Sequence, residues 1–172
     1  MKKALALALC LILLLCGCDK KAVPYYEAPA EGVTLTSLYQ YCYADEDGIF
    51  AQWVNNTDAN IYFTDEFRLE KLSGERWVTV SKKEAPVFNT DYHHFVEPGI
   101  ESLNHYDLTL YTDGLNDGVT YRISTYYYND NGEYYQIYAT FLCDEEKAEE
   151  EITKLMEQSA ALAENSEDPA AE

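Results

Sequence analysis

An all-β domain followed by a short C-terminal helix is the fold class that this 172-residue sequence predicts. Over residues 33–143, runs of β-branched and aromatic residues alternate with clusters of Gly, Asn, Asp and Pro. The spacing of these clusters is roughly 8–12 residues, which is typical of β-sandwiches. No stretch of about 10–15 residues with helical periodicity separates the runs, which excludes a parallel α/β sheet. We therefore expect an antiparallel β-sandwich of seven to eight strands.

The predicted strands lie between residues that favour tight turns. Asn55-Asn56, Ser73-Gly74, Pro98-Gly99, Asp113-Gly114 and Asn131-Gly132 mark the clearest breaks, because Gly and Asn tolerate the positive φ angles of turns. The strands are expected over residues 33–43, 49–55, 61–71, 76–80, 92–96, 102–111, 119–128 and 133–142.

The N-terminus has the pattern of a bacterial lipoprotein signal. Lys2 and Lys3 precede an apolar run over residues 4–15, which is too short for the roughly 20 residues that span a bilayer core. A basic start and a short apolar run indicate a cleaved export signal. The run ends in Leu15-Cys16-Gly17-Cys18, so we expect residues 1–17 to be removed and Cys18 to be lipidated. The alternative is an ordinary export signal that contains cysteines by chance.

These features predict a protein that faces the outside of the bacterial cell membrane and is held there by acyl chains. Residues 18–32 are expected to form the lipidated cysteine and a flexible, extended linker, because Pro24, Pro29 and Gly32 interrupt any apolar period. The chain has 12 Lys and Arg against 31 Asp and Glu, a net charge of −19, and loss of Lys2 and Lys3 leaves −21. So acidic a chain, without a basic patch, excludes nucleic-acid binding.

The composition changes after residue 143. Asp144 is a suitable N-cap, and Glu145 and Glu146 favour the positive end of a helix dipole. Apolar residues then recur at helical spacing on one side: Ala148, Ile152, Leu155, Met156, Leu162 and Ala163. We expect residues 144–172 to form an acidic helix over 145–163 and a disordered tail from 164. The helix is expected to dock on the sandwich, to stay solvated or to pair with a partner helix.

One motif makes the fold prediction more specific. Leu115-x-x-Gly118-x-x-Tyr121-x-Ile123 resembles the tyrosine corner, in which a Tyr hydroxyl bonds back to the loop before its strand. Residues 33–143 as a whole resemble a bacterial Ig-like domain family that is common in surface lipoproteins. The other matching residues are Asn55-Asn56-Thr57, Phe67-x-Leu69-Glu70-Lys71, Trp77-x-x-Val80, Pro98-Gly99 and Phe141. The resemblance implies an immunoglobulin-like β-sandwich with no cofactor and no known catalytic residue.

Two cysteines, Cys42 and Cys143, remain once the signal is removed and Cys18 is lipidated. An even pair in an exported domain predicts one disulfide, and the alternative is two free thiols. The resemblance implies that the end of the first strand runs parallel beside the last strand. It would place any Cys42–Cys143 bond at one end of the sandwich rather than in its core. No metal site is expected, because neither cysteine has a second ligand at zinc-like spacing.

Tyrosines are the candidate binding residues. The chain has 16, and six belong to the last predicted hairpin: Tyr126, Tyr127, Tyr128, Tyr134, Tyr135 and Tyr138. Because strand side chains alternate, consecutive tyrosines occupy both faces of a sheet, so some must point outward. Exposed Tyr rings bind sugars or partner proteins, and we choose Tyr126, Tyr128 and Tyr134 as the contact. The alternative is that these residues serve only strand formation and cross-strand pairing.

No catalytic motif, such as G-x-S-x-G or H-E-x-x-H, occurs in the mature chain, so no catalytic residue is assigned and no enzyme is expected. No metal and no cofactor are expected either. The function that we predict is a membrane-anchored, non-catalytic binding or scaffolding module for an envelope protein. The alternative is a glycan-binding or cell-wall-binding lipoprotein that assists a transporter or a wall enzyme.

Overall fold

The computed structural model describes residues 24–83 and 93–166. In these residues it contains ten strands, one 3-10 helix and one α-helix. The strands are β1 (Tyr25–Tyr26), β2 (Val33–Ser37), β3 (Tyr41–Cys42), β4 (Gly48–Asn55), β5 (Ile61–Ser73), β6 (Arg76–Thr79), β7 (His94–Val96), β8 (Glu101–Asp107), β9 (Thr120–Asn129) and β10 (Tyr134–Cys143). The helices are η1 (Leu108–Leu110) and α2 (Glu145–Ser166).

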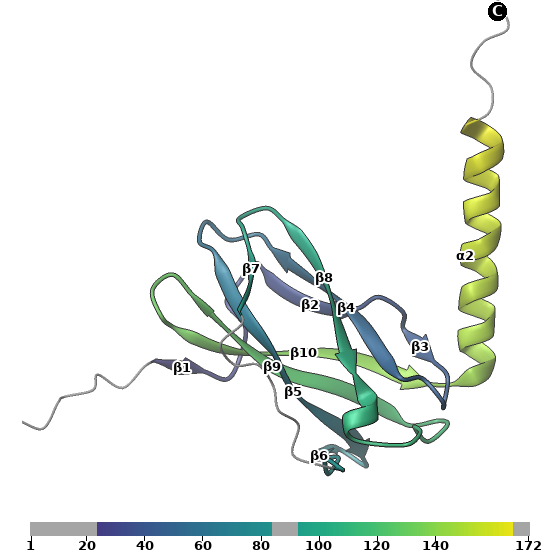
Figure 1. Cartoon of the computed structure of the whole chain (residues 1–172), viewed down its shortest axis with the longest axis horizontal. Helices are drawn as coiled ribbons and strands as arrows, with labels where there is room; N and C mark the ends of the chain where they lie inside the picture. Colours follow the sequence, from purple (N-terminus) through teal and green to yellow (C-terminus); the bar gives the residue numbers. More distant parts are fainter. Residues whose placement is uncertain (1–23, 84–92, 167–172) are drawn as a thin grey trace, which may run out of the picture.

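The strands form two sheets that face each other, as Figure 1 shows. The larger sheet has the order β1-β10-β9-β5-β6, and β3 and β7 pair with β10 and β5. The smaller sheet has the order β2-β4-β8. The predicted all-β sandwich with one C-terminal helix is confirmed, with two strands more than the eight predicted: β1 and β3, of two residues each.

The core lies between the sheets and is built from the inward positions of alternating strands. Trp53 on β4 crosses the interface, stacking on Phe63 of β5 at 4.2 Å between ring centroids and meeting Tyr127 of β9 edge-on at 5.9 Å. Its Nε1–H donates to the hydroxyl of Tyr106 at 3.2 Å, so the buried indole has a partner. Leu69 and Ile123 are also fully buried in this layer. Burying this much apolar area is the main stabilising contribution to the fold.

The first predicted strand is divided between the two sheets. β2 pairs with β4 in the smaller sheet, and β3 pairs in parallel with β10 in the larger one. The chain changes sheets over residues 38–40, where Leu38 N–H donates to Phe50 O at 2.8 Å and Leu142 N–H donates to Gln40 O at 3.0 Å. The single strand predicted over 33–43 is therefore wrong, because alternation along a chain does not reveal which neighbour each half pairs with.

Two other boundaries differ from the prediction. The strand expected over 102–111 ends at Asp107, whose carboxylate accepts from Thr109 N–H at 2.9 Å and so begins the 3-10 turn η1. The linker expected over 18–32 is partly ordered against the sandwich, because β1 pairs in parallel with β10 and Ala30 N–H donates to the Tyr127 hydroxyl at 2.8 Å. Residues 18–23 of that linker and the signal over 1–17 lie outside the described residues.

The tyrosine corner is confirmed. Tyr121, the second residue of β9, is buried, and its hydroxyl accepts from the N–H of Asn116 at 3.0 Å. Gly118, between the two, has a φ of 72°, a conformation that side chains other than glycine rarely adopt. The corner therefore joins the loop before β9 to the core at a fixed place.

Asn55 closes the opposite end of the sandwich with a fully buried amide. Its Nδ2 donates to the carbonyl oxygens of Ala59 and Val96, each at 2.9 Å. Its Oδ1 accepts from both the N–H and the hydroxyl of Thr57. A polar side chain can be buried here because each of its polar atoms has a partner.

α2 begins at Glu145 as predicted and extends to Ser166, three residues beyond the predicted end. Asp144 caps it, since its carboxylate accepts from Lys147 N–H at 3.1 Å. The disordered tail predicted from residue 164 is wrong for residues 164–166, which belong to α2, and residues 167–172 lie outside the described part of the chain. Within residues 24–83 and 93–166, no helix is long and apolar enough to cross a bilayer.

Candidate binding site

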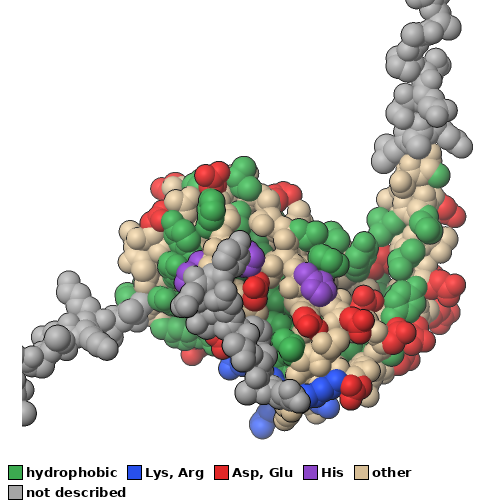
Figure 2. Space-filling model, viewed as in Figure 1, with side chains coloured by type: hydrophobic (Ala, Val, Ile, Leu, Met, Phe, Trp, Pro, Cys, Tyr) green, Lys and Arg blue, Asp and Glu red, His purple; other side chains and the backbone are tan. Residues whose placement is uncertain are grey.

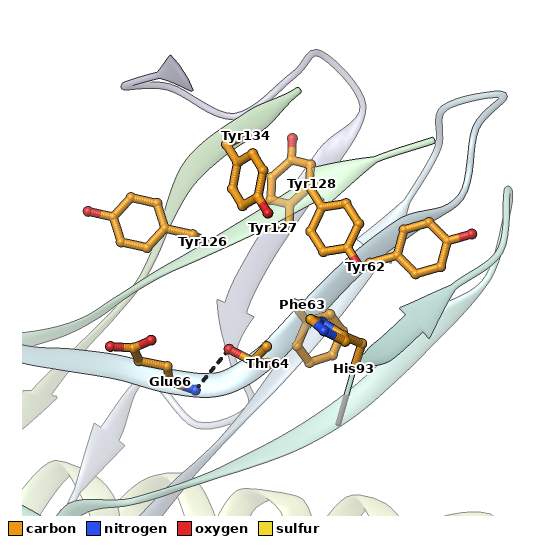
Figure 3. Close-up of a pocket in the computed structure, with 9 residues that line it drawn as sticks. All are labelled: Tyr62, Phe63, Thr64, Glu66, His93, Tyr126, Tyr127, Tyr128 and Tyr134. Carbon is orange, nitrogen blue, oxygen red and sulfur yellow. Dashed lines mark hydrogen bonds between the residues drawn. The ribbon is translucent and has the colours of Figure 1, made fainter. Parts of the chain in front are cut away.

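A groove of about 310 Å³ lies on the outer face of the larger sheet, over β5, β9 and β10 (Figure 3). Aromatic side chains dominate its walls. The residues that line it are Tyr62, Phe63, Thr64, Glu66, His93, Tyr126, Tyr127, Tyr128 and Tyr134.

The structure brings together all three tyrosines that the sequence singled out. Tyr126 and Tyr128 are outward positions of β9, and Tyr134 of β10 is the direct partner of Tyr128 in the antiparallel pairing. Tyr127 is buried because it alternates with them and points inward. The expected division of the hairpin tyrosines between two faces is therefore confirmed, while their binding role stays a prediction.

A row of stacked rings forms one wall of the groove. Tyr62, Tyr128 and Tyr134 come from three adjacent strands, and Tyr62 is the direct partner of Tyr128 across β5 and β9. The ring centroids are 5.1 Å apart for Tyr62–Tyr128 and 5.3 Å apart for Tyr128–Tyr134, with interplanar angles of 17° and 29°. His93 meets Tyr128 edge-on at 5.7 Å. Sequence analysis missed Tyr62, because only the pairing register places it beside Tyr128.

A bulge in β5 opens the groove. Phe63 pairs with Tyr127 and Phe67 with Thr125, so three residues of β5 lie opposite the single residue Tyr126 of β9. The extra residues turn away from the ladder and make the second wall, which Figure 3 shows across from Tyr126. Bulges are over-represented where a sheet presents a site, because they redirect side chains.

Side chains within the sandwich hold the bulge in place. The hydroxyl of Thr125 donates to Glu66 O at 2.7 Å, and Glu66 N–H donates to the hydroxyl of Thr64 at 3.3 Å. Asp65 Oδ1 lies 2.8 Å from His94 Nε2, and the His94 ring stacks on Phe63 at 5.0 Å. The groove is therefore built before any ligand arrives.

The hydroxyl groups of the groove differ in what they already bind. Tyr62 donates to Asp130 Oδ1 at 2.9 Å, and this hydrogen bond raises the pKa of Tyr62. The Tyr126 oxygen accepts from Arg68 at 2.9 Å, which leaves its proton able to donate. Within residues 24–83 and 93–166, the hydroxyls of Tyr128 and Tyr134 have no hydrogen-bond partner. Three hydroxyl groups can therefore bond to a ligand.

The rest of the outer face of this sheet is occupied by its own side chains. Arg122 donates to Glu70 at 2.6 Å, and its guanidinium lies between the rings of Tyr138 at 3.9 Å and Trp77 at 4.4 Å. Both charged groups are mostly buried, so this cluster is a closed structural pair rather than a binding surface. The groove is the part of the sheet that stays open.

The fold agrees with a comparison against protein families. The family model described as bacterial Ig-like domain matches residues 29–142. This chain belongs to that family. Among curated proteins no match is found, and among solved structures none is found either. Bacterial Ig-like domains are usually extracytoplasmic and typically non-catalytic, so the family indicates a surface or binding module.

The two cysteines of the Ig-like domain are neighbours but are not bonded. Cys42 and Cys143 are direct partners in the parallel pairing of β3 with β10, at one end of the sandwich. Both are buried free thiols, which differs from the predicted disulfide. Backbone hydrogen bonds of the β3–β10 pairing bring them together without a covalent bond, and burial raises the pKa of both thiols. Cys18, the predicted lipidation site, lies outside the described residues.

Metal-binding side chains do not gather in the described part of the Ig-like domain. Among residues 24–83 and 93–166, no group of three or more His, Cys, Asp or Glu side chains can hold a metal ion. The histidines are separated: His94 contacts Asp65, His93 contacts Tyr128, and His105 makes a tilted ring contact with Phe50 on the smaller sheet. The chemistry that the groove offers is aromatic contact and hydrogen bonding.

Proposed function

We propose that this protein is a lipid-anchored, non-catalytic binding module that holds another envelope protein in its tyrosine groove. The observation that carries the proposal is the stacked row of Tyr62, Tyr128 and Tyr134 beside a preformed bulge. Tyr provides a large, rigid contact area with one polar tip and is enriched at protein interfaces. Because the rings support one another, little side-chain entropy is lost on binding.

The stacking favours a protein over a glycan. A sugar ring needs an open aromatic face, but Tyr128 lies between Tyr62 and Tyr134 and has a neighbour on each side. The row thus presents ring edges and hydroxyl groups, which suit the side chains and carbonyl groups of a peptide segment. Tyr62 and Tyr134, at the two ends of the row, each have one stacked neighbour in it, and Tyr134, which is 41% exposed, is the more open position for sugar stacking.

Charge limits the kind of partner. Glu66 lines the groove, and at the edge of the groove Asp130 accepts a hydrogen bond from the Tyr62 hydroxyl. The chain as a whole carries a net charge of −19. An acidic partner surface, a nucleic acid or an anionic lipid head group would be repelled. The partner segment that fits is neutral or basic, with apolar or amide-bearing side chains.

The position of the anchor supports a partner near the membrane. Tyr25 of β1 lies beside the groove, with its ring 5.8 Å from that of Tyr126 and its hydroxyl donating to Gln136 at 3.0 Å. Seven residue steps separate Cys18 from Tyr25, and a fully extended chain of that length spans at most about 25 Å. A lipid on Cys18 would therefore hold the groove close to the bilayer, within reach of a membrane-bound envelope protein rather than a distant wall layer.

A capture experiment with two arms tests this function. The protein would be incubated with detergent-solubilised envelope proteins and, separately, with purified cell-wall sacculi. The groove variant is Tyr128→Ser/Tyr134→Ser, and the matched control is Phe50→Ser/Leu103→Ser, which removes two exposed apolar side chains from the smaller sheet.

We expect the wild type and the control to capture the same discrete envelope protein in equal amounts. The groove variant is expected to capture at least tenfold less of that protein. Equal capture by the groove variant would refute the proposal. Binding to sacculi that only the groove variant loses would instead support the glycan alternative.

A further inference from the structure

The row of tyrosines extends beyond the groove at both ends. Tyr134 is the direct partner of Tyr25 on β1, and Tyr62 is the direct partner of Phe95 on β7. Tyr128 lies between Tyr134 and Tyr62 in the same register. Direct partners on neighbouring strands point to the same face of a sheet. Five aromatic side chains therefore form one line across five strands, which we call the aromatic line.

The aromatic line is open at its ends and stacked in its middle. Tyr25 and Phe95 are each more than half exposed. The rings of Tyr62, Tyr128 and Tyr134 stack side by side between them, as Figure 3 shows. Because neighbouring strands are about 4.8 Å apart, the four steps from Tyr25 to Phe95 cover about 19 Å. A ligand that uses the whole line must be elongated and must lie across the strands.

The position of the line within the sheet excludes binding by strand addition. β9, which carries the middle ring, lies between β10 and β5. Its backbone N–H and C=O groups therefore face neighbouring strands and not an open edge. An added strand needs the free backbone groups of a sheet edge. The ligand must be held through side chains alone.

The hydroxyl groups of the line favour one backbone conformation of the ligand. Tyr128 and Tyr134 line the groove, and within residues 24–83 and 93–166 their hydroxyls have no partner, so both can donate to a carbonyl group. Carbonyl groups in the middle of an α-helix already accept from the N–H groups of the helix. A polyproline II segment has no internal hydrogen bonds, so its carbonyl groups are free. Proline also brings no N–H group that would need an acceptor.

A polyproline II segment also fits the length and the charge of the site. Its rise is about 3.1 Å per residue, so about six residues cover the line. Figure 2 shows acidic side chains on the sandwich and along α2, and Glu66 lines the groove itself. Uncharged proline rings are not repelled by this surface. The conformation exists before binding, so less entropy is lost than with a flexible chain.

We propose that the tyrosine groove and the aromatic line bind a proline-rich segment of the partner in the polyproline II conformation. This inference rests on the proposed function and names the chemistry of the partner segment. Tyr128 and Tyr134 donate to carbonyl groups of the segment. Tyr25 and Phe95 contact its two ends and so determine the length that is recognised.

The test uses the full chain and two peptides of about ten residues that carry the same fluorophore. One peptide contains only proline, and the other alternates Gly and Ser, which form flexible chains. Binding is measured by fluorescence anisotropy. The donor variant is Tyr128→Phe/Tyr134→Phe, which keeps both rings and removes both hydroxyls. The end variant is Phe95→Ser, and its matched control is Leu103→Ser, which removes a similarly exposed apolar side chain from the smaller sheet.

We expect the proline peptide to bind the wild type and Leu103→Ser with equal Kd. The donor variant is expected to have a Kd at least fivefold higher, because two hydrogen bonds are lost. Phe95→Ser is expected to raise the Kd at least threefold. The Gly/Ser peptide is expected to bind the wild type at least tenfold more weakly than the proline peptide. All variants are expected to keep the circular dichroism spectrum of the wild type.

Two results with the peptides would overturn the proposal. Equal binding of the proline and Gly/Ser peptides would show no preference for polyproline II, and equal Kd values for the wild type and the donor variant would show that the hydroxyls do not donate. The capture experiment separates this inference from the proposed function. If capture of an envelope protein depends on Tyr128 and Tyr134 but the proline peptide does not bind, this inference fails and the proposed function stands. If neither depends on these tyrosines, both fail.

Discussion

Cys42 and Cys143 are direct partners in the parallel pairing of β3 and β10, and both side chains are buried thiols. Cys42 lies in β3, directly after the chain has changed sheets, and Cys143 lies two positions before α2. Whether these thiols are oxidised therefore affects both the end of the sandwich and the base of the projecting helix.

We predict that an exported, oxidised form of the protein contains a Cys42–Cys143 disulfide. The bond closes a loop of about 100 residues, and chain-entropy arguments give a stabilisation of about 2–5 kcal/mol for such a loop. The measurement is urea unfolding of a chain that starts at Asp19, with and without reductant, alongside intact mass. The single variant Cys42→Ala is the control, since it cannot gain from oxidation. Equal unfolding midpoints for the oxidised and reduced wild type would contradict the prediction.

The same thiols are expected to react slowly in the folded, reduced protein. Burial raises the pKa of both, so the nucleophilic thiolate is scarce at neutral pH. A thiol reagent such as Ellman's is expected to modify both cysteines rapidly only after denaturant is added. Rapid modification without denaturant would mean that β3 opens readily from β10.

The tyrosine corner offers a test of the two hydrogen bonds that the Tyr121 hydroxyl accepts, from the N–H of Asn116 at 3.0 Å and from its Nδ2 at 3.3 Å. Tyr121→Phe removes the acceptor of the Asn116 N–H while keeping the buried ring, and we expect it to lower the free energy of unfolding by about 1–2 kcal/mol. The control is Tyr134→Phe, whose hydroxyl has no partner among the described residues and whose loss is expected to be close to neutral. Chemical denaturation of both variants is the measurement, and equal losses would argue against a specific contribution from the corner.

Substitution of Asn55 is expected to lower the free energy of unfolding more than substitution of Tyr121. Asn55→Ala removes four hydrogen bonds and leaves the buried carbonyl of Val96 without its amide partner, so we expect a loss of about 2–4 kcal/mol. Asn56→Ala is a matched control, because Asn56 is exposed and contributes its backbone N–H to Gly32 rather than its side chain. A loss in Asn56→Ala as large as that in Asn55→Ala would show that the loop, not the buried amide, carries the stability.

Alkaline pH is expected to unfold the domain through its buried tyrosines. Burial raises the pKa of Tyr106, Tyr111 and Tyr127 to about 12 each. The folded state thus retains phenol protons that the unfolded chain releases near pH 10. Their contribution to stability is complete below pH 10 and is lost as the pH rises from about 10 to about 12. The free energy of unfolding, measured over this pH range, is expected to fall less steeply with pH in Tyr127→Phe than in the wild type. An equal slope in both would contradict a contribution from the buried Tyr127 hydroxyl.

Local pattern determined much of this protein. Alternation of apolar and polar residues, together with turn residues at Ser73-Gly74 and Asn131-Gly132, predicted the long strands and the β9–β10 hairpin close to their observed bounds. The same alternation separated outward Tyr126 and Tyr128 from inward Tyr127. Such features are readable from a sequence because each depends on the conformational preferences of neighbouring residues.

Only the tertiary structure decided the features that make the sites. The change of sheets over residues 38–40, the addition of β1 to β10 and the β5 bulge opposite Tyr126 all depend on which distant strand supplies hydrogen bonds. Tyr62 joins the stacked row through that pairing, and the base of α2 is held by the hydrogen bonds from Gln40 and Tyr41 N–H to Glu151. Pairing between residues far apart in the chain depends on the energy of the whole fold. It therefore cannot be predicted from the local pattern of residues.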